Sequence, residues 1–180
     1  MTLASRRRFV ATLAALAPLA GSARAAFAPA PQAPRALVFA HLHTGERLAV
    51  EYFAGGRYLS DALAEVNHLL RDFRSGEVAA IDPALLDLLH ALAARTGTPG
   101  RPFEVISGFR SPATNEMLRH RSSGVASGSL HMRGQAIDIR VAGVPLAGLR
   151  DAALALRGGG VGFYPASDFV HVDTGRVRAW

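Results

Sequence analysis

The sequence predicts an α+β fold: a single domain with a small antiparallel sheet flanked by helices. Strand-like runs open the chain after residue 35 and dominate its last third, whereas helical periodicity fills much of the middle. Helices and strands that are segregated along a chain are typical of α+β domains rather than of alternating α/β folds. The length of 180 residues suits one such domain.

Turn residues and periodicity define the first half of the chain. Thr44-Gly45 separates two strand-like runs, which predicts a hairpin. Apolar residues then recur at spacings of three and four up to Ser75-Gly76, which predicts a helix. Asp82-Pro83 has the form of an N-cap followed by proline at the first helical position, so a second helix begins there. The elements predicted here are strands at 36–42 and 47–53, a helix from residue 60 to about 74 and a helix from residue 82 to near 97.

The second half alternates shorter elements with glycine-rich connections. Ser111-Pro112 repeats the cap-and-proline signal, and the Ser/Gly-rich stretch 122–129 is typical of a flexible loop. Three consecutive glycines at 158–160 end the last predicted helix. The elements predicted here are a strand at 102–107, a helix at 112–121, a strand at 135–141, a helix at 146–157 and a strand at 169–173.

Residues 1–25 have the features of an export signal. Consecutive arginines at 6–8 precede Phe9, an apolar run follows, and Ala23-Arg24-Ala25 has the form of a cleavage site. The paired arginines favour the twin-arginine route over an ordinary Sec signal. The apolar run is too short to span a bilayer, so no stable membrane anchor is expected after cleavage. We therefore predict a signal at 1–25, a Pro/Ala linker at 26–34 and a periplasmic domain at 35–180.

The net charge and the absence of cysteine argue against several kinds of function and of metal site. The formal net charge of the whole chain is +6, but residues 1–25 contain four arginines and no acid, so the remaining chain carries about +2. This excess is too small to support nucleic-acid binding. The chain has no cysteine. Disulfides are therefore excluded, and any metal site must use His, Asp or Glu.

Two predicted strands bring a histidine and an aspartate to one side of the sheet. Because side chains alternate along a strand, Asp138 faces away from the isoleucines on either side of it, and His171 faces away from its flanking valines. If the two strands are neighbours, Asp138 and His171 project together. His131 lies seven residues before Asp138, and Gly134 allows the loop between them to turn back.

Two imidazoles and one carboxylate suit a zinc site whose fourth position is open to water. An internal hydrogen-bonded His–Asp pair fits the same residues, and the pattern alone does not decide between them. The other conspicuous residues favour structural roles. His41 and His43 lie on one strand face without a nearby carboxylate except Glu46, and Trp180 is interpreted as a packing residue.

Several motifs in order resemble one known family. The stretch S-x-H-x-x-G-x-A-x-D at 129–138 resembles the signature of the D-alanyl-D-alanine zinc peptidases, a clan that includes VanX-type enzymes and is similar in fold to lysostaphin-type enzymes and the hedgehog domain. SGFRSPATN (107–115), GGVGFYP (159–165) and FVHVDTG (169–175) resemble the YcbK-like murein endopeptidase branch of that clan. The similarity extends over nearly the whole chain after the signal.

The resemblance implies a function and a set of ligands. It implies one zinc ion per chain, held by His131, Asp138 and His171, and the peptides of peptidoglycan as substrate. Related activities stay open at this point: a D,D- or L,D-carboxypeptidase, or a non-catalytic module that binds zinc or the cell wall. Paired carboxylates at Asp168 and Asp173 also fit a carbohydrate-active enzyme.

The resemblance leaves two candidates for the general base that a hydrolytic zinc site needs. Across the clan the acid often lies three residues before the second histidine ligand, which is Asp168 here. In the YcbK-like branch the motif acid lies two residues after it, which is Asp173. We favour Asp173 at the site, as base or as a residue that orients a ligand. Arg110 is predicted to contact the substrate carbonyl or carboxylate.

Overall fold

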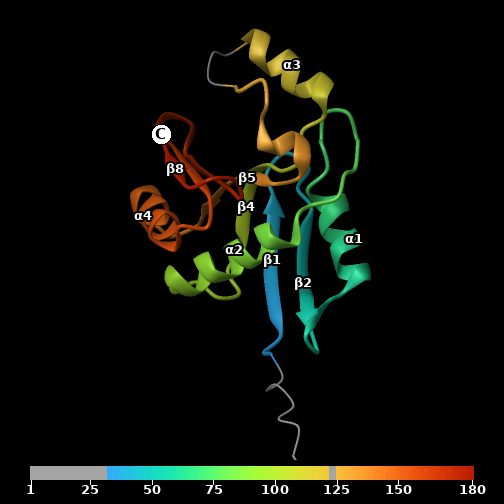
Figure 1. The fold of residues 1–180 in the computed structure, drawn as a ribbon, viewed down its shortest axis with the longest axis vertical. Helices are drawn as coiled ribbons and strands as arrows, with labels where there is room; N and C mark the ends of the chain where they lie inside the picture. Colours follow the sequence, from blue (N-terminus) through green and yellow to red (C-terminus); the bar gives the residue numbers. More distant parts are fainter. Residues whose placement is uncertain (1–31, 122–124) are drawn as a thin grey trace, which may run out of the picture. The chain divides into compact units, whose positions relative to one another are not determined.

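A computed structural model describes residues 32–121 and 125–180 (Figure 1). Within these ranges four α-helices accompany an eight-stranded sheet, so the predicted α+β class is confirmed. No helix in the described ranges is long and apolar enough to cross a bilayer. The predicted signal at 1–25 and most of the linker at 26–34 lie outside the described residues.

The sheet is larger than predicted, and it is mixed rather than purely antiparallel. Its spatial order is β3-β2-β1-β4-β5-β7-β6-β8, with β1 parallel to β4 and β6 parallel to β8. Two helices separate β2 from β4, and a connection of that length allows the chain to re-enter the sheet parallel to β1. The strands are β1 (Arg35–His41), β2 (Arg47–Ala54), β3 (Arg57–Tyr58), β4 (Phe103–Ser107), β5 (Ala136–Val141), β6 (Gly160–Tyr164), β7 (Phe169–Asp173) and β8 (Arg178–Ala179).

The helices begin where the capping signals predict. The Asp82 carboxylate accepts a hydrogen bond from the Ala84 backbone N–H, with Pro83 as the first residue of α2. Helix α1 ends at Leu69, earlier than expected, because the chain turns at Asp72, whose side chain accepts the Arg74 backbone N–H. The helices are α1 (Ser60–Leu69), α2 (Pro83–Arg95), α3 (Pro112–Arg121) and α4 (Leu146–Leu156), with short 3-10 helices η1 (Leu130–Arg133) and η2 (Pro165–Ser167).

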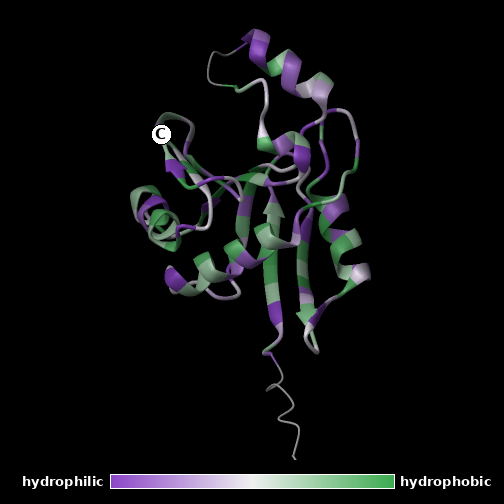
Figure 2. Cartoon of the chain, viewed as in Figure 1, coloured by the Kyte–Doolittle hydropathy of each residue, from purple (hydrophilic) through white to green (hydrophobic). Residues whose placement is uncertain are grey.

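Helices α2 and α4 pack against each other and against the sheet. Four leucines of α2 are fully buried, and burial of each such side chain stabilises the fold by about 1.5–3 kcal/mol. Figure 2 shows that α3, by contrast, is largely hydrophilic. It buries only Thr114 and Asn115, and its first turn is held by a hydrogen bond from the Thr114 N–H to Ser111 Oγ.

The apolar residues of two central strands determine where the site forms. Ile137, Ile139, Val170 and Val172 are buried in the core. Strands β5 and β7 pair antiparallel, with Asp138 directly opposite His171. Because side chains alternate, both of these residues leave the sheet on the face opposite to the isoleucines and valines. The condition under which Asp138 and His171 were expected to project together is therefore met.

Candidate metal centre

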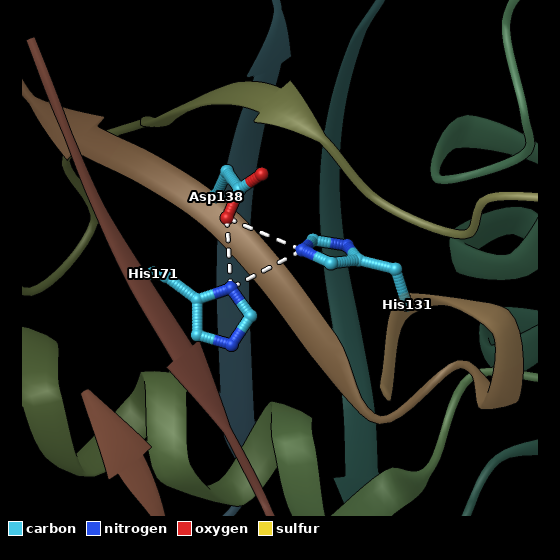
Figure 3. Close-up of side chains that lie close together, drawn as sticks. All are labelled: His131, Asp138 and His171. Atoms are coloured by element: carbon cyan, nitrogen blue, oxygen red, sulfur yellow. Dashed lines mark hydrogen bonds and ion pairs between the residues drawn. The ribbon is translucent and has the colours of Figure 1, made fainter. Parts of the chain in front are cut away.

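Three side chains converge above β5 and β7 (Figure 3). Asp138 Oδ1 lies 2.9 Å from His171 Nδ1 across the strand pair. His131 Nε2 lies 3.2 Å from Asp138 Oδ1 and 3.2 Å from His171 Nδ1. All three residues are buried. The structure thus brings together the three residues that the sequence suggested as metal ligands.

Gly134 explains how His131 reaches Asp138. Residue 134 ends η1 with φ +65°, a left-handed conformation that glycine adopts without strain. A Cβ atom here would lie 2.1 Å from the Ala80 carbonyl oxygen, so only glycine fits. The Gly134 carbonyl accepts a hydrogen bond from the Asp82 N–H at 3.0 Å, which ties the turn to the start of α2. The seven-residue spacing is therefore one tight turn followed by the first half of β5.

The outer hydrogen bonds of the two histidines fix their tautomers. His131 Nδ1 lies 2.7 Å from the Gly108 carbonyl oxygen, which can only accept, so Nδ1 carries the proton. His171 Nε2 lies 3.0 Å from Asp173 Oδ2, so Nε2 is the protonated nitrogen of that ring. The inner nitrogens, His131 Nε2 and His171 Nδ1, therefore face each other and Asp138, and each is the atom that could bind a metal ion.

Asp138 contributes a negative charge to the same point. Burial alone would raise the pKa of this carboxyl, but the charges and hydrogen bonds of His131 and His171 outweigh it and hold the pKa well below its ordinary value. Asp138 Oδ1 and the inner nitrogens of the two histidines are therefore three atoms that could each bind one metal ion. A positive charge at this point, carried by a metal ion or by a proton on His171, balances the buried carboxylate of Asp138.

The spacing of the three atoms fits a tetrahedral cation. Zinc binds histidine nitrogen and carboxylate oxygen at about 2.0–2.1 Å, which separates neighbouring tetrahedral ligands by about 3.3 Å. The observed separations of 2.9, 3.2 and 3.2 Å are close to this value. In the described parts of the chain no other group of three or more His, Asp or Glu residues meets the same criterion.

Asp173 is buried beside His171, and both of its carboxylate oxygens accept hydrogen bonds. Oδ2 accepts from His171 Nε2 at 3.0 Å and from Arg178 Nη2 at 2.7 Å. Oδ1 accepts from the backbone N–H groups of Gly160 and Gly175 and from Arg178 Nη1. Burial would raise the pKa of Asp173, but these donors hold it well below its ordinary value. The geometry favours the second of its two expected roles, orientation of a ligand.

Asp168 lies at the rim of the site. Its side chain is 62% exposed and accepts from Arg140 Nη1 at 2.6 Å. Ser167 and Phe169 line the cavity above the three ligands, whereas Asp168 itself does not. Asp168 and Asp173 therefore do not face each other across one cavity, and the paired-carboxylate chemistry of carbohydrate-active enzymes loses its support.

Arg110 joins two of the ligands. Its backbone N–H donates to the His131 carbonyl oxygen at 3.2 Å, and its Nη2 lies 3.4 Å from Asp138 Oδ2 and 3.3 Å from Ser107 Oγ. The residue is buried, and burial lowers the pKa of its guanidinium, although Asp138 opposes this shift. Arg110 also lines the cavity, with Nε lacking an acceptor among the described residues.

A cavity of about 410 Å³ opens over the three ligands. Arg110 and Arg178 make its lining basic, and Tyr164, Phe169 and Trp180 form an aromatic wall. Trp180, which the sequence pattern indicated to be a packing residue, lies in this wall. The GGVGFYP motif at 159–165, which includes Tyr164, was the sequence signal that could have indicated this aromatic wall.

His41 and His43, for which the sequence favours structural roles, make structural contacts. His41 is buried, and its Nδ1 accepts the backbone N–H groups of His43 and Thr44 at the end of β1. His43 stacks on Phe73 with ring centroids 4.2 Å apart. Burial lowers the pKa of His41 to about 4, so this ring is neutral at physiological pH.

The α+β fold and the buried two-histidine, one-aspartate cluster beneath an open cavity fit a metallopeptidase domain, and the family match assigns this class. The chain belongs to the family described as peptidoglycan L,D-endopeptidase MepK, whose sequence profile matches residues 29–180. The family expected from the sequence motifs is thereby confirmed.

Individual relatives agree with this assignment. A protein of Escherichia coli (strain K12) named peptidoglycan L,D-endopeptidase MepK is 48% identical over 147 residues, covering 82% of this chain and 80% of the relative. The protein of the same name from Shigella flexneri gives the same values. A relative from Haemophilus influenzae is 44% identical over 147 residues, covering 82% of this chain and 79% of that protein.

Proposed function

We propose that this protein is a zinc-dependent endopeptidase that hydrolyses L,D-peptide bonds between the stem peptides of peptidoglycan. One zinc ion per chain is held by His131, Asp138 and His171. The convergence of three potential ligand atoms beneath the cavity carries this proposal. The names of the relatives support the substrate and the type of bond.

Zinc bound at this centre would supply a Lewis acid that lowers the pKa of a bound water to about 7 and polarises a carbonyl group. The protein residues hold this chemistry in place. Asp173 keeps the proton of His171 on Nε2, and Gly108 keeps the proton of His131 on Nδ1. Arg110 partly neutralises Asp138 and presents its guanidinium to the substrate.

We assign the general base to Asp168. Asp173 has no free lone pair directed at the cavity, because five donors surround it. The Asp168 carboxylate is exposed, and its ion pair with Arg140 is a surface pair that contributes about 0–1 kcal/mol. That interaction is weak enough for Asp168 to turn toward the cavity when substrate binds, and catalytic hydrogen bonds commonly tighten only at that stage.

The features of residues 1–25 support a periplasmic location. We propose that residues 1–25 direct export, by the twin-arginine route, and that the domain at 35–180 acts in the periplasm after cleavage. The linker at 26–34 separates the signal from this domain. Peptidoglycan is then directly accessible to the cavity.

Hydrolysis of purified sacculi tests this proposal. Zinc-loaded protein should release fragments that mass spectrometry identifies as products of cleavage at L,D-peptide bonds, and a chelator should abolish their release. The variants His131→Ala and His171→Ala serve as controls for contaminating hydrolases. Release of the same fragments by both variants, or by the chelated protein, would contradict the proposal.

A further inference from the structure

A tyrosine and a tryptophan form a hydrogen-bonded pair in the wall of the cavity. The indole Nε1–H of Trp180 donates to the Tyr164 hydroxyl oxygen at 2.7 Å. Both side chains line the cavity that contains His131, Asp138 and His171. The Trp180 ring lies 5.3 Å from the His171 ring, between centroids. The pair is thus next to the metal centre.

A glycine in the sheet leaves space for these two rings. Gly162 in β6 lies directly opposite His171 in β7. A Cβ atom at residue 162 would lie 2.7 Å from the Trp180 ring and 2.8 Å from the Tyr164 ring. Any side chain here would therefore displace one ring or the other, and the glycine keeps both rings against the strand.

Backbone bonds and stacking hold both rings in place. The backbone of Trp180 donates to Val161 and accepts from Phe163, which fixes this residue beside β6. The guanidinium of Arg178 lies 4.7 Å from the centre of the indole ring. The Tyr164 ring stacks on Phe169 with centroids 4.6 Å apart. The hydroxyl of Tyr164 therefore has a defined position.

The direction of the indole hydrogen bond determines what the tyrosine can offer. An indole N–H can only donate, so the Tyr164 oxygen accepts and its own proton must point elsewhere. Among the described residues no acceptor is hydrogen-bonded to this hydroxyl. A phenolic donor is left available in the cavity that His131, Asp138 and His171 also line.

We propose that Tyr164 is a catalytic residue that donates a hydrogen bond to the carbonyl oxygen of the scissile peptide bond as charge develops there. Trp180 is a positioning residue that fixes the direction of the Tyr164 hydroxyl. This inference rests on the proposed peptidase function. Attack by water forms a C–O bond, and the carbonyl π pair moves onto the oxygen. Tyr164 keeps its proton throughout, and the leaving nitrogen receives a proton from the attacking water when the C–N bond breaks.

Substitution of Tyr164 by phenylalanine tests the catalytic role. Loss of one donor to an oxyanion lowers kcat by about 10²–10³-fold, whereas KM changes little because the charge forms only in the transition state. Tyr164→Phe keeps the ring and its stacking on Phe169, so zinc content and melting temperature should equal those of the wild type. Tyr58→Phe is the matched control, because Tyr58 bonds to Asp87 outside the cavity.

Substitution of Trp180 by phenylalanine tests the positioning role. Trp180→Phe removes the N–H donor and keeps an aromatic ring, so kcat should fall by about 10-fold or more. The double variant should be no slower than Tyr164→Phe alone, because the indole then has no hydroxyl to orient. Multiplied losses in the double variant would overturn the positioning role.

The indole resonance gives a readout that does not depend on activity or metal. The chain contains one tryptophan, so its indole N–H gives a single NMR signal. In metal-free protein this signal should shift upfield in Tyr164→Phe and stay in place in Tyr58→Phe. An unchanged signal in Tyr164→Phe would overturn the Trp180–Tyr164 bond.

The outcomes separate this inference from the proposed function. An active wild-type enzyme whose Tyr164→Phe variant keeps full kcat overturns the role of Tyr164 alone. The same holds if kcat and melting temperature fall together in Tyr164→Phe, because the residue is then structural. A zinc-loaded wild type that cleaves no peptidoglycan overturns the proposed function and this inference with it.

Discussion

Replacement of Asp173 by asparagine should weaken zinc binding through the tautomer of His171. Asparagine has one oxygen and one NH₂ group in place of the two carboxylate oxygens. In either orientation of the amide, the NH₂ group would face hydrogen-bond donors. On the Oδ1 side it would meet three donors, from Gly160, Gly175 and Arg178. On the Oδ2 side it would meet two, from Arg178 and His171. The NH₂ group is therefore expected at the Oδ2 position.

An NH₂ group at that position favours a proton on the inner nitrogen of His171. Nε2 would then accept from Asn, which places the ring proton on Nδ1, toward Asp138. The lone pair that holds the metal is lost in this tautomer. Loss of an outer partner of a metal-bound histidine lowers affinity by about 10–100-fold, which corresponds to about 1.4–2.7 kcal/mol.

Competition titration with a chromophoric zinc chelator measures this loss, and kinetics at rising zinc concentration show whether activity returns. Asp173→Asn should bind zinc more weakly and recover much of its kcat in excess zinc. Asp168→Asn is the matched control. It should keep wild-type zinc affinity and melting temperature but lose about 10²–10⁴ in kcat, the usual contribution of a general base. Wild-type zinc affinity with lost turnover in Asp173→Asn would refute this reasoning and make Asp173 the base.

Three further predictions concern folding and export. Gly134→Ala should lower the melting temperature and zinc affinity together, since a Cβ would lie 2.1 Å from the Ala80 oxygen at φ +65°; calorimetry that finds wild-type stability would contradict this. Asp72 is buried, and although burial would raise its pKa, hydrogen bonds from Thr114, Ser111 and Arg74 lower it from 3.8 to about 2. Its contribution of about 2 kcal/mol is present above pH 4 and lost as pH falls from 4 to 2, so metal-free Asp72→Asn should be less stable at pH 7 and should lack this part of the acid transition. Replacement of Arg6-Arg7 by Lys-Lys should strongly reduce export in cell fractionation, and unchanged export would indicate the Sec route.

The sequence was most informative where local pattern determines geometry. Alternation of isoleucine and valine with Asp138 and His171 predicted their shared face, because the core must bury the apolar residues. Gly134 indicated the turn that returns His131 to the same place. These three positions could be inferred from the residues and motifs before the structure was known.

The parts that sequence did not predict depend on contacts between distant segments. Strand β6 begins within a run of glycines that locally indicates a break, and it forms because β7 and β8 pair with it on either side. The role of Asp173 in β7 depends on Gly160 in the adjacent β6 and on Arg178 in β8, one strand further along the sheet. Trp180 enters the cavity wall only because Gly162 leaves room. None of these contacts has a local signature.

Zinc analysis of purified variants tests the central claim most directly. Wild-type protein should bind one zinc per chain, and His131→Ala, Asp138→Ala and His171→Ala should each lose zinc after dialysis against a dilute chelator. His120→Ala, whose side chain is 77% exposed outside the cavity, is the control and should retain one zinc. One zinc per chain, bound with wild-type affinity, in all three ligand variants would contradict the assignment of the metal centre.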